Sequence, residues 1–148
     1  MTAYLDTSGG PPAASGELED EDLMAQGKDK AILLVDHGSR LSEANEMLEE
    51  IAALMARVAP SYHVGLAHME LAEPTIEQGF VACVAAGARE IIVQPYMLSP
   101  GRHSTQDIPR MVEEAARHHP GVKFRITEPL GVDERLAQLI VDRVEEAE

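Results

Sequence analysis

The feature that most limits the fold of this chain is a regular alternation of apolar runs with stretches of helical periodicity, which begins at Lys30. The apolar runs read AILLVDH, HVGLAHME, EIIVQPYML and KFRITEPL, at residues 31–37, 63–70, 90–98 and 123–130. A short, nearly continuous apolar run is typical of a strand that is buried on both faces of a sheet. The runs therefore predict the strands of an α/β protein.

A helix is predicted after each of these strands. After the first strand, apolar residues recur in steps of three and four from Ala44 to Val58, which places them on one helix face. The other predicted helices cover residues 75–88, 108–119 and 133–147. Successive strand–helix units predict a parallel sheet of four strands with right-handed crossovers and helices on both faces, so that the fold has three layers.

The size and composition of the chain limit the class of protein. A chain of 148 residues has room for one domain with a single core. Its 45% hydrophobic and 26% charged residues are those of an ordinary globular protein. No apolar run approaches the roughly 18 residues that a membrane-spanning helix needs, so we expect no membrane partner.

Charge and cysteine content exclude further classes. The net charge of −14, from 12 basic and 26 acidic residues, argues against a nucleic-acid partner, because phosphate contacts need clustered Lys and Arg. The single cysteine, Cys83, cannot form an internal disulfide or hold an iron–sulfur cluster. Since the sequence also shows no secretory signal, we expect the protein in the cytoplasm.

The N-terminal segment differs from the rest of the chain. Residues 1–29 mix Gly, Pro, Ala and Ser with the acidic run ELEDED and show no useful periodicity. Such a composition buries too little apolar surface to fold, so we predict a disordered acidic tail, with a short helix over residues 19–26 as the alternative. The folded domain is predicted to span residues 30–148.

Polar residues gather where the predicted strands end. In a parallel α/β sheet, ligands bind beyond the carboxyl ends of the strands, so the segments that follow the strands should open on one side. These segments are residues 36–40, 68–74, 99–103 and 128–131. They carry His37, Glu70 and His103, with His68 as a further candidate, and these residues can therefore converge although they are far apart in the sequence.

Two imidazoles and one carboxylate suggest metal or proton chemistry. Such a set suits a first-row divalent ion such as iron, cobalt, nickel or zinc, whereas calcium and magnesium ask for oxygen ligands. Histidine has an unperturbed pKa of about 6.5, so the same residues can also accept protons near neutral pH. The alternative is a structural hydrogen-bonding role for each histidine, and it has most weight for His68.

Three motifs together resemble one known family. DHGSR, HMELAEPTI and PYMLSPGRHSTQDIP, at residues 36–40, 68–76 and 95–109, are similar in order and separation to the motifs of the small class II chelatases. Those enzymes insert a divalent metal ion into sirohydrochlorin for siroheme or cobalamin synthesis. The resemblance covers the chain from about Lys30 to Glu148.

The resemblance implies a fold, an assembly and a set of site residues. It implies a half-size chelatase-like fold with four or five parallel strands, and a homodimer. By position, His37 and His103 match the metal-binding and catalytic histidines of the family, and Glu70 matches their acidic partner. It also implies that the metal is a substrate, Co2+ or Fe2+ with Ni2+ as a third candidate, and that no cofactor is permanently bound.

Residues beside the two histidines are predicted to bind the tetrapyrrole, which is rich in carboxylates. Arg40 and Arg102 flank the histidines and can pair with those carboxylates. Gly38 and Gly101 would let the backbone approach the substrate closely. Ser39, which follows Gly38, is also predicted to bind the substrate. The alternative for each arginine is a solvated surface charge or an ion pair with a nearby acid.

Other candidate residues have structural interpretations. Cys83 lies on an apolar helix face, which favours a core role over a reactive thiol. Asp107, Ser104 and Thr105 are predicted to cap the N-terminus of a helix.

Two rival functions stay open: a non-catalytic carrier of a tetrapyrrole or metal, and a metal-dependent hydrolase, which would need further Asp or His ligands.

Overall fold

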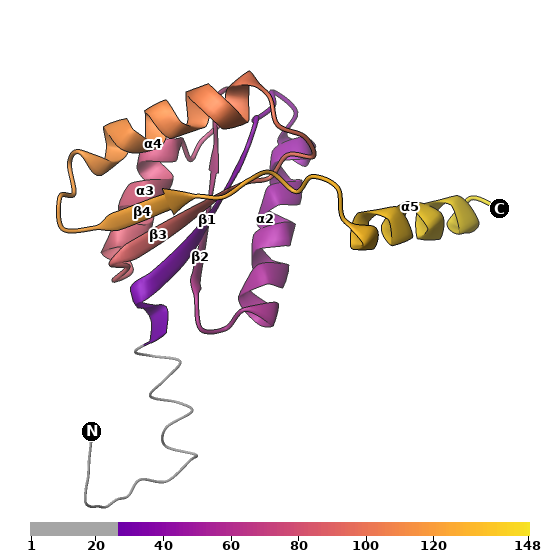
Figure 1. Ribbon diagram of the computed structural model, residues 1–148, viewed down its shortest axis with the longest axis horizontal. Helices are drawn as coiled ribbons and strands as arrows, with labels where there is room; N and C mark the ends of the chain where they lie inside the picture. Colours follow the sequence, from indigo (N-terminus) through magenta and orange to yellow (C-terminus); the bar gives the residue numbers. More distant parts are fainter. Residues whose placement is uncertain (1–26) are drawn as a thin grey trace, which may run out of the picture.

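The computed structural model describes residues 27–148. Along the chain these residues form η1 (Gly27–Asp29), β1 (Lys30–Asp36), α2 (Ser42–Val58), β2 (His63–His68), α3 (Ile76–Ala85), β3 (Glu90–Pro95), η2 (His103–Asp107), α4 (Ile108–Ala116), β4 (Lys123–Ile126) and α5 (Glu134–Glu146) (Figure 1). No helix within residues 27–148 has the length and hydropathy that crossing a membrane requires.

The strands form one parallel sheet in the order β2-β1-β3-β4. The register pairs Leu33 of β1 with Gly65 of β2 and Val93 of β3, and it pairs Val93 with Ile126 of β4. β1 and β3 therefore lie in the centre, and all strands end at the same edge. The predicted α/β class with a parallel sheet of four strands is confirmed, and no fifth strand forms within residues 27–148.

α3 and α4 cover one face of the sheet and enclose the main core (Figure 1). Leu33, Ile91 and Val93 point to this face from β1 and β3 and are fully buried. They belong to one apolar cluster with Phe80 of α3 and Ile108 of α4. Burying side chains of this size removes most of their apolar surface from water, which is the main stabilisation of the sheet.

Local sequence signals explain why α3 begins and ends where it does. The Thr75 hydroxyl accepts a hydrogen bond from the Gln78 backbone N–H at 3.1 Å, and the Gln78 side chain accepts one from the Thr75 N–H at 2.8 Å. This capping box satisfies two N–H groups that a helix N-terminus leaves without partners. The helix ends at Ala85, shortly before Gly87, which has a φ of +107°, so the predicted helix over residues 75–88 stops three residues early.

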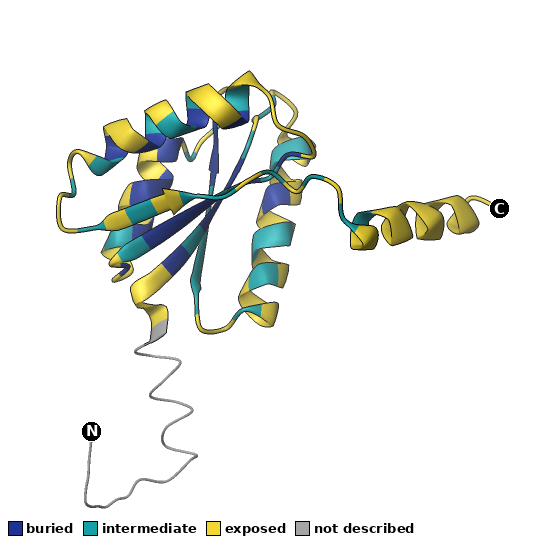
Figure 2. Cartoon of the chain, viewed as in Figure 1, coloured by how far each residue is buried: buried dark blue, intermediate teal, exposed yellow. Residues whose placement is uncertain are grey.

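The opposite face of the sheet is covered by α2 alone. Ile51 and Met55 of α2 border a groove whose floor includes Ile32 and Leu34 of β1. α5 projects away from the sheet (Figure 1) and contains no buried residue (Figure 2). Helices are thus present on both faces of the sheet as predicted, but α5, the last helix, covers neither face.

The boundaries of the elements correct several predictions. Residues 1–26 of the predicted tail, including the alternative helix over residues 19–26, lie outside the described residues. The last part of that tail, Gly27–Asp29, forms η1 and accepts a backbone hydrogen bond through Asp29 O from Arg89 N at 2.6 Å, so the described domain begins before Lys30. β3 ends at Pro95, three residues before the predicted end. Tyr96 N still donates to Val35 O of β1 at 2.6 Å, whereas on the side of β4 proline has no N–H with which to extend the ladder.

Candidate functional site

The two central strands bring their following segments to one point of the carboxyl edge. The chain runs from β1 outward to β2 and returns to β3 beside β1, so the strand order reverses between β1 and β3. Ligands of α/β sheets bind at such a reversal point. His37 directly follows β1, and His103 begins η2 after β3.

The segment after β1 is held tightly against the segment after β2. Glu70 N donates a hydrogen bond to His37 O at 3.1 Å, and Met69 N donates one to Asp36 O at 2.9 Å. Gly38 has a φ of +89°, and a Cβ at this position would lie 1.8 Å from Glu70 O. Only glycine fits here, because both the backbone conformation and the space exclude a side chain. Gly38 therefore fixes the position of His37, and this role needs no ligand.

Ser39 anchors the start of α2. Its hydroxyl accepts a hydrogen bond from Leu41 N at 3.0 Å. Its backbone is held at both ends by the Asn45 amide, which accepts from Ser39 N at 3.0 Å and donates to Ser39 O at 2.8 Å. Asn45 was not singled out from the sequence, because an asparagine inside a helix carries no signal of the loop that it binds. These contacts give Ser39 a structural role beside its predicted substrate-binding one.

The buried His68 pairs with the partly buried Asp36 beneath the edge. His68 Nδ1 lies 2.6 Å from Asp36 Oδ1, and the two side chains are 1% and 19% exposed. The carboxylate of Asp36 is the acceptor, so the imidazole donates from Nδ1. Since the ring is enclosed and already has a partner, His68 is a structural hydrogen-bonding residue, which is the alternative that the sequence left open.

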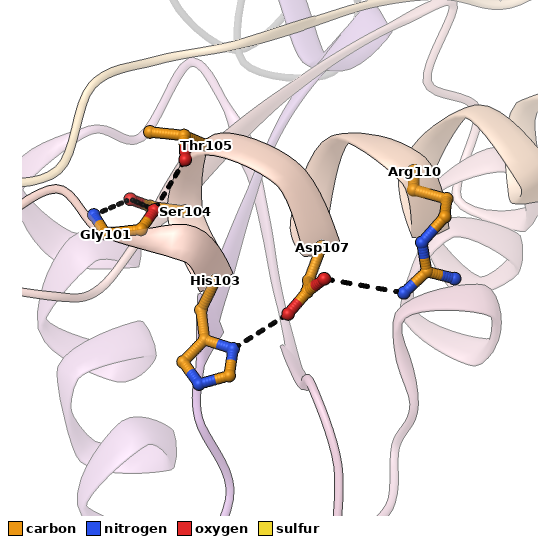
Figure 3. Close-up of polar contacts among 6 residues, drawn as sticks. All are labelled: Gly101, His103, Ser104, Thr105, Asp107 and Arg110. Atoms are coloured by element: carbon orange, nitrogen blue, oxygen red, sulfur yellow. Dashed lines mark hydrogen bonds and ion pairs between the residues drawn. The ribbon is translucent and has the colours of Figure 1, made fainter.

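The segment that presents His103 is a short π-helix, in which Ile108 N donates to His103 O. Gly101 holds its start: Gly101 N donates to Ser104 Oγ at 3.0 Å, and Thr105 Oγ1 donates to Gly101 O at 2.7 Å (Figure 3). Wide helical turns of this kind occur often at functional sites. Here the wide turn lies at the entry to α4 and sets the direction in which the His103 ring points.

The His103 ring is oriented by Asp107. His103 Nδ1 lies 3.0 Å from Asp107 Oδ2, and Arg110 lies 3.6 Å from the other carboxylate oxygen (Figure 3). The predicted helix-capping role of Asp107 is wrong, because its side chain makes no cap hydrogen bond and pairs with the imidazole instead. A ring that donates from Nδ1 keeps the lone pair of Nε2 for a metal ion or a proton.

The structure brings the two predicted histidines together. The centroids of the His37 and His103 rings are 4.9 Å apart, and the ring planes meet at 84°. His37 is exposed, and the His103 side chain is 44% exposed, so both rings are open to solvent at the carboxyl edge. Neutral imidazoles in such an arrangement can bind a first-row divalent ion or accept protons.

The carboxylate of Glu70 does not join the two rings. Within residues 27–148, no group of three or more His, Cys, Asp or Glu side chains lies close enough to hold a metal ion together. Glu70 is next to His37 through its backbone, while its side chain is exposed. The predicted trio is therefore a pair of imidazoles with a carboxylate on the adjoining loop.

The other predicted substrate-binding residues lie around this pair. Arg40 and Arg102 are exposed, and in the described part of the chain neither one pairs with an acidic side chain. A Cβ added to Gly101 would meet nothing within 4 Å, so this glycine borders open space. The two guanidinium groups are thus available to anionic groups of a ligand at the same edge.

Cys83 is part of the core, as predicted. Its side chain is fully buried in the cluster that α3 shares with the sheet. Burial raises the pKa of its thiol to about 11, because the thiolate would be poorly solvated there. A thiol of this kind is neither a ready nucleophile nor a ready metal ligand.

Comparison with known proteins identifies relatives along most of the chain. The sequence model of the CbiX family matches residues 31–147. The chain is 42% identical over 129 residues to the sirohydrochlorin ferrochelatase, chloroplastic, of Arabidopsis thaliana, an alignment that covers 86% of this chain and 57% of the relative. It is 36% identical over 115 residues to the sirohydrochlorin cobaltochelatase of Sulfurisphaera tokodaii, with 78% of this chain and 91% of the relative covered.

Solved structures show the same similarity in three dimensions. The sirohydrochlorin chelatase SirB from Bacillus subtilis subspecies spizizenii, in complex with cobalt, superimposes with a TM-score of 0.74 at 33% identity, over 79% of this chain and 50% of that one. A putative cobalamin biosynthesis CbiX protein from Marinobacter aquaeolei gives a TM-score of 0.66 at 33% identity, over 80% of this chain and 96% of that one. The chain thus spans about half the length of several relatives and nearly the whole length of others.

Proposed function

This chain belongs to the CbiX family, and from this premise we propose that it is a sirohydrochlorin chelatase that inserts a divalent metal ion, Co2+ or Fe2+, into the tetrapyrrole. The observation that carries the proposal is the pair of exposed imidazoles, 4.9 Å apart, at the point where the strand order reverses. The relatives named ferrochelatase and cobaltochelatase support the same reaction with different metals. The physiological metal, and with it a siroheme or cobalamin pathway, is left to an assay with each ion.

The proposed reaction exchanges two pyrrole protons for one metal ion. A free tetrapyrrole carries two N–H protons that must leave as the ion enters, so the protein has to supply a base and weak ligands at one place. In our proposal His37 and His103 hold the incoming ion through ring nitrogens and then accept the protons. Glu70 takes part as a further ligand or proton acceptor from the adjoining loop. The pyrrole nitrogens replace the imidazoles as ligands, and the product leaves with the metal.

Two protein ligands suit an ion that must depart. Metal sites that hold a resident ion commonly supply three or four protein ligands, whereas among residues 27–148 this edge groups only the two imidazoles, with the Glu70 carboxylate on the adjoining loop outside that group. This favours a chelatase over the metal-dependent hydrolase. The Nδ1 contact of His103 with Asp107 holds the ring so that Nε2 stays free for the ion or a proton.

The test of the function is the rate of metal insertion, followed by the absorption change of sirohydrochlorin with Co2+ or Fe2+. We expect His103→Ala to lower the rate by about 100-fold or more, the contribution typical of a general base. His118→Ala is the matched control, because His118 is an exposed histidine just beyond the end of α4. Equal rates for the two folded variants would contradict the assignment. A wild-type protein that binds the tetrapyrrole without accelerating insertion would instead be the carrier.

Substrate binding is proposed to depend on Arg40 and Arg102, with Gly38, Ser39 and Gly101 lining the approach. We expect Arg102→Ala to weaken sirohydrochlorin binding by about tenfold, because each charge-assisted contact contributes about 1.5 kcal/mol or more. Arg89→Ala is the control, since Arg89 is exposed beside Glu90 at the opposite end of β3. Titration of the apoprotein with sirohydrochlorin measures both. Equal losses would mean that the effect of Arg102 is only one of overall charge.

Assembly and location complete the proposal. We propose a homodimer, which is supported by the relatives of twice the length, since two copies of this chain match the size of one of those proteins. A cytoplasmic location stays our prediction, and the relative named chloroplastic makes a plastid the alternative. A fluorescent fusion of the full chain in its source cell decides between the two compartments.

A further inference from the structure

Two leucines at the carboxyl edge expose their side chains to solvent. Leu41 follows Arg40 in the segment after β1 and is 65% exposed. Leu71 follows Glu70 in the segment after β2 and is 53% exposed. A single exposed leucine is common on protein surfaces and needs no explanation. These two differ from most, because each occupies a backbone position that favours a residue of another type.

The backbone of Leu71 has a left-handed conformation. Its φ is +73°, and among residues 27–148 no other residue except glycine has a positive φ. The Cβ of a bulky residue crowds the backbone in this region, so the position favours glycine or asparagine. Burial of the side chain does not offset this cost, because more than half of the residue stays in contact with water.

The loop that carries Leu71 is fixed at both of its ends. Two backbone hydrogen bonds, from Met69 N and Glu70 N to the segment after β1, hold its entry. His68 N donates to Pro74 O at 2.8 Å and so closes the loop. A strained backbone persists only where the surrounding structure enforces it, and such residues cluster at binding and catalytic sites. The conformation of Leu71 is therefore evidence for a role at the loop's tip.

Leu41 is the N-cap of α2, where its backbone is extended with φ −86° and ψ 119°. An N-cap side chain normally accepts a hydrogen bond from the first turn of the helix, which Ser, Thr, Asp and Asn can do. Leucine has no acceptor atom, and this N-cap makes no side-chain hydrogen bond. Neither helix capping nor burial thus explains a leucine at this position.

Both leucines lie beside residues of the candidate site. The two segments are in close contact, since a Cβ at Gly38 would lie 1.8 Å from Glu70 O. Leu41 comes three residues after Gly38, and Leu71 comes directly after Glu70. Their apolar side chains therefore belong to the same part of the carboxyl edge as the ring of His37.

We propose that Leu41 and Leu71 are substrate-binding residues that pack against the ring system of the tetrapyrrole. The inference rests on the proposed function and adds a second kind of contact to it. The substrate carries carboxylates at its periphery and a flat, largely apolar ring system inside them. Arg40 and Arg102 suit the carboxylates, whereas apolar side chains gain free energy when they remove the ring system from water. Sites built for a ligand commonly break the local rules that favour the fold, and both leucines do so.

Substitution by asparagine separates binding from folding, because the two should not change together. Asparagine adopts a left-handed backbone more readily than leucine and is also a favoured N-cap. Leu71→Asn and Leu41→Asn should therefore keep or raise the melting temperature measured by circular dichroism. Titration with sirohydrochlorin should nevertheless give a Kd about four- to tenfold larger for each variant, because each loses the burial of about half of a leucine side chain.

Val58→Asn is the matched control for a lost exposed apolar side chain. Val58 is 73% exposed and ends α2 at the opposite edge of the sheet, where β2 begins beside Ala31. This variant should bind sirohydrochlorin as the wild type does. Leucine variants that bind as tightly as the wild type, or that lose no more affinity than Val58→Asn, would overturn the proposal.

Two further readouts distinguish a direct contact from an indirect effect on the site. Titration with Co2+ alone should give the same affinity for Leu71→Asn as for the wild type, because the imidazoles are untouched; weaker Co2+ binding would mean that the loop had moved and would overturn the proposal. The loss of sirohydrochlorin affinity in Leu71→Asn should be equal at low and high salt, because apolar contacts are not screened, whereas the loss in Arg102→Ala should shrink. A loss in Leu71→Asn that shrinks with salt would contradict an apolar contact.

The same titrations separate this inference from the proposed function. A wild-type protein that does not bind sirohydrochlorin would contradict the proposed function and the leucine contacts together. A wild-type protein that binds sirohydrochlorin and inserts the metal, with both leucine variants binding equally well, would contradict the leucine contacts alone.

Discussion

Replacing Gly38 by alanine tests whether the approach of the two loops positions His37. The new Cβ would lie 1.8 Å from Glu70 O, and the residue would have to keep a φ of +89°. A non-glycine residue in such a conformation costs about 1–3 kcal/mol. Relieving the contact requires the loops to separate, which breaks the 3.1 Å hydrogen bond from Glu70 N to His37 O and costs about 0.5–1.5 kcal/mol more. We therefore expect the free energy of unfolding to fall by about 2–4 kcal/mol.

The assay is chemical and thermal unfolding followed by circular dichroism. A loss of this size should lower the melting temperature by roughly 6–15 °C for a domain of this length. Gly101→Ala is the matched control, because its Cβ would meet nothing within 4 Å and its φ is not positive. Metal insertion by Gly38→Ala should also fall, since His37 moves with the loop. Unfolding midpoints that agree for the two variants would refute the account of how His37 is held.

Three further predictions follow from paired or buried side chains. Asp107→Ala should lower the rate of metal insertion about 10- to 100-fold, because it releases the His103 ring. The melting temperature of this variant should change little, because the pair of His103 and Asp107 is partly exposed. An unchanged rate would mean that Asp107 does not orient the ring. Asp36→Ala should instead lower the free energy of unfolding by about 1–3 kcal/mol in urea titrations, because it leaves the buried His68 without its partner. Burial raises the pKa of the Cys83 thiol from 9.0 to about 11, so the folded state keeps its proton where the unfolded state loses it. Relative to Cys83→Ala, the free energy of unfolding should then fall by about 1.4 kcal/mol for each pH unit between about 9 and 11, and parallel pH profiles would contradict this.

The fold was predictable where one local pattern determines one structure. The run around Leu33 is apolar because both faces of β1 are covered, and such a run has few other interpretations. The stripe of Leu136, Leu139 and Ile140 likewise predicted a helix, and α5 is one. The stripe contains no information on what it packs against, because any apolar surface satisfies the same pattern. The apolar periodicity therefore could not predict that α5 projects away from the sheet.

The position of the candidate site was predictable from the sequence, but the contacts that orient its side chains were not. His37 and His103 each follow a strand, and parallel strands end at one edge, so their proximity follows from topology. The role of Asp107 does not, because an aspartate just before a helix is typical of a cap and its pairing with His103 depends on the wide turn of η2. That turn requires hydrogen bonds to Gly101 that no spacing rule predicts.

Burial separates the histidines that the sequence places at this edge. His68 and His103 both pair with an aspartate through Nδ1, so their local chemistry is the same. The His68 side chain is 1% exposed, and a metal ion could reach its Nε2 only if the loops after β1 and β2 opened, which Gly38 and the His37–Glu70 hydrogen bond oppose. The His103 side chain is 44% exposed and faces a second imidazole. Of the two paired histidines, His103 alone can receive an ion from solvent and release it again, as the proposed insertion into a tetrapyrrole requires.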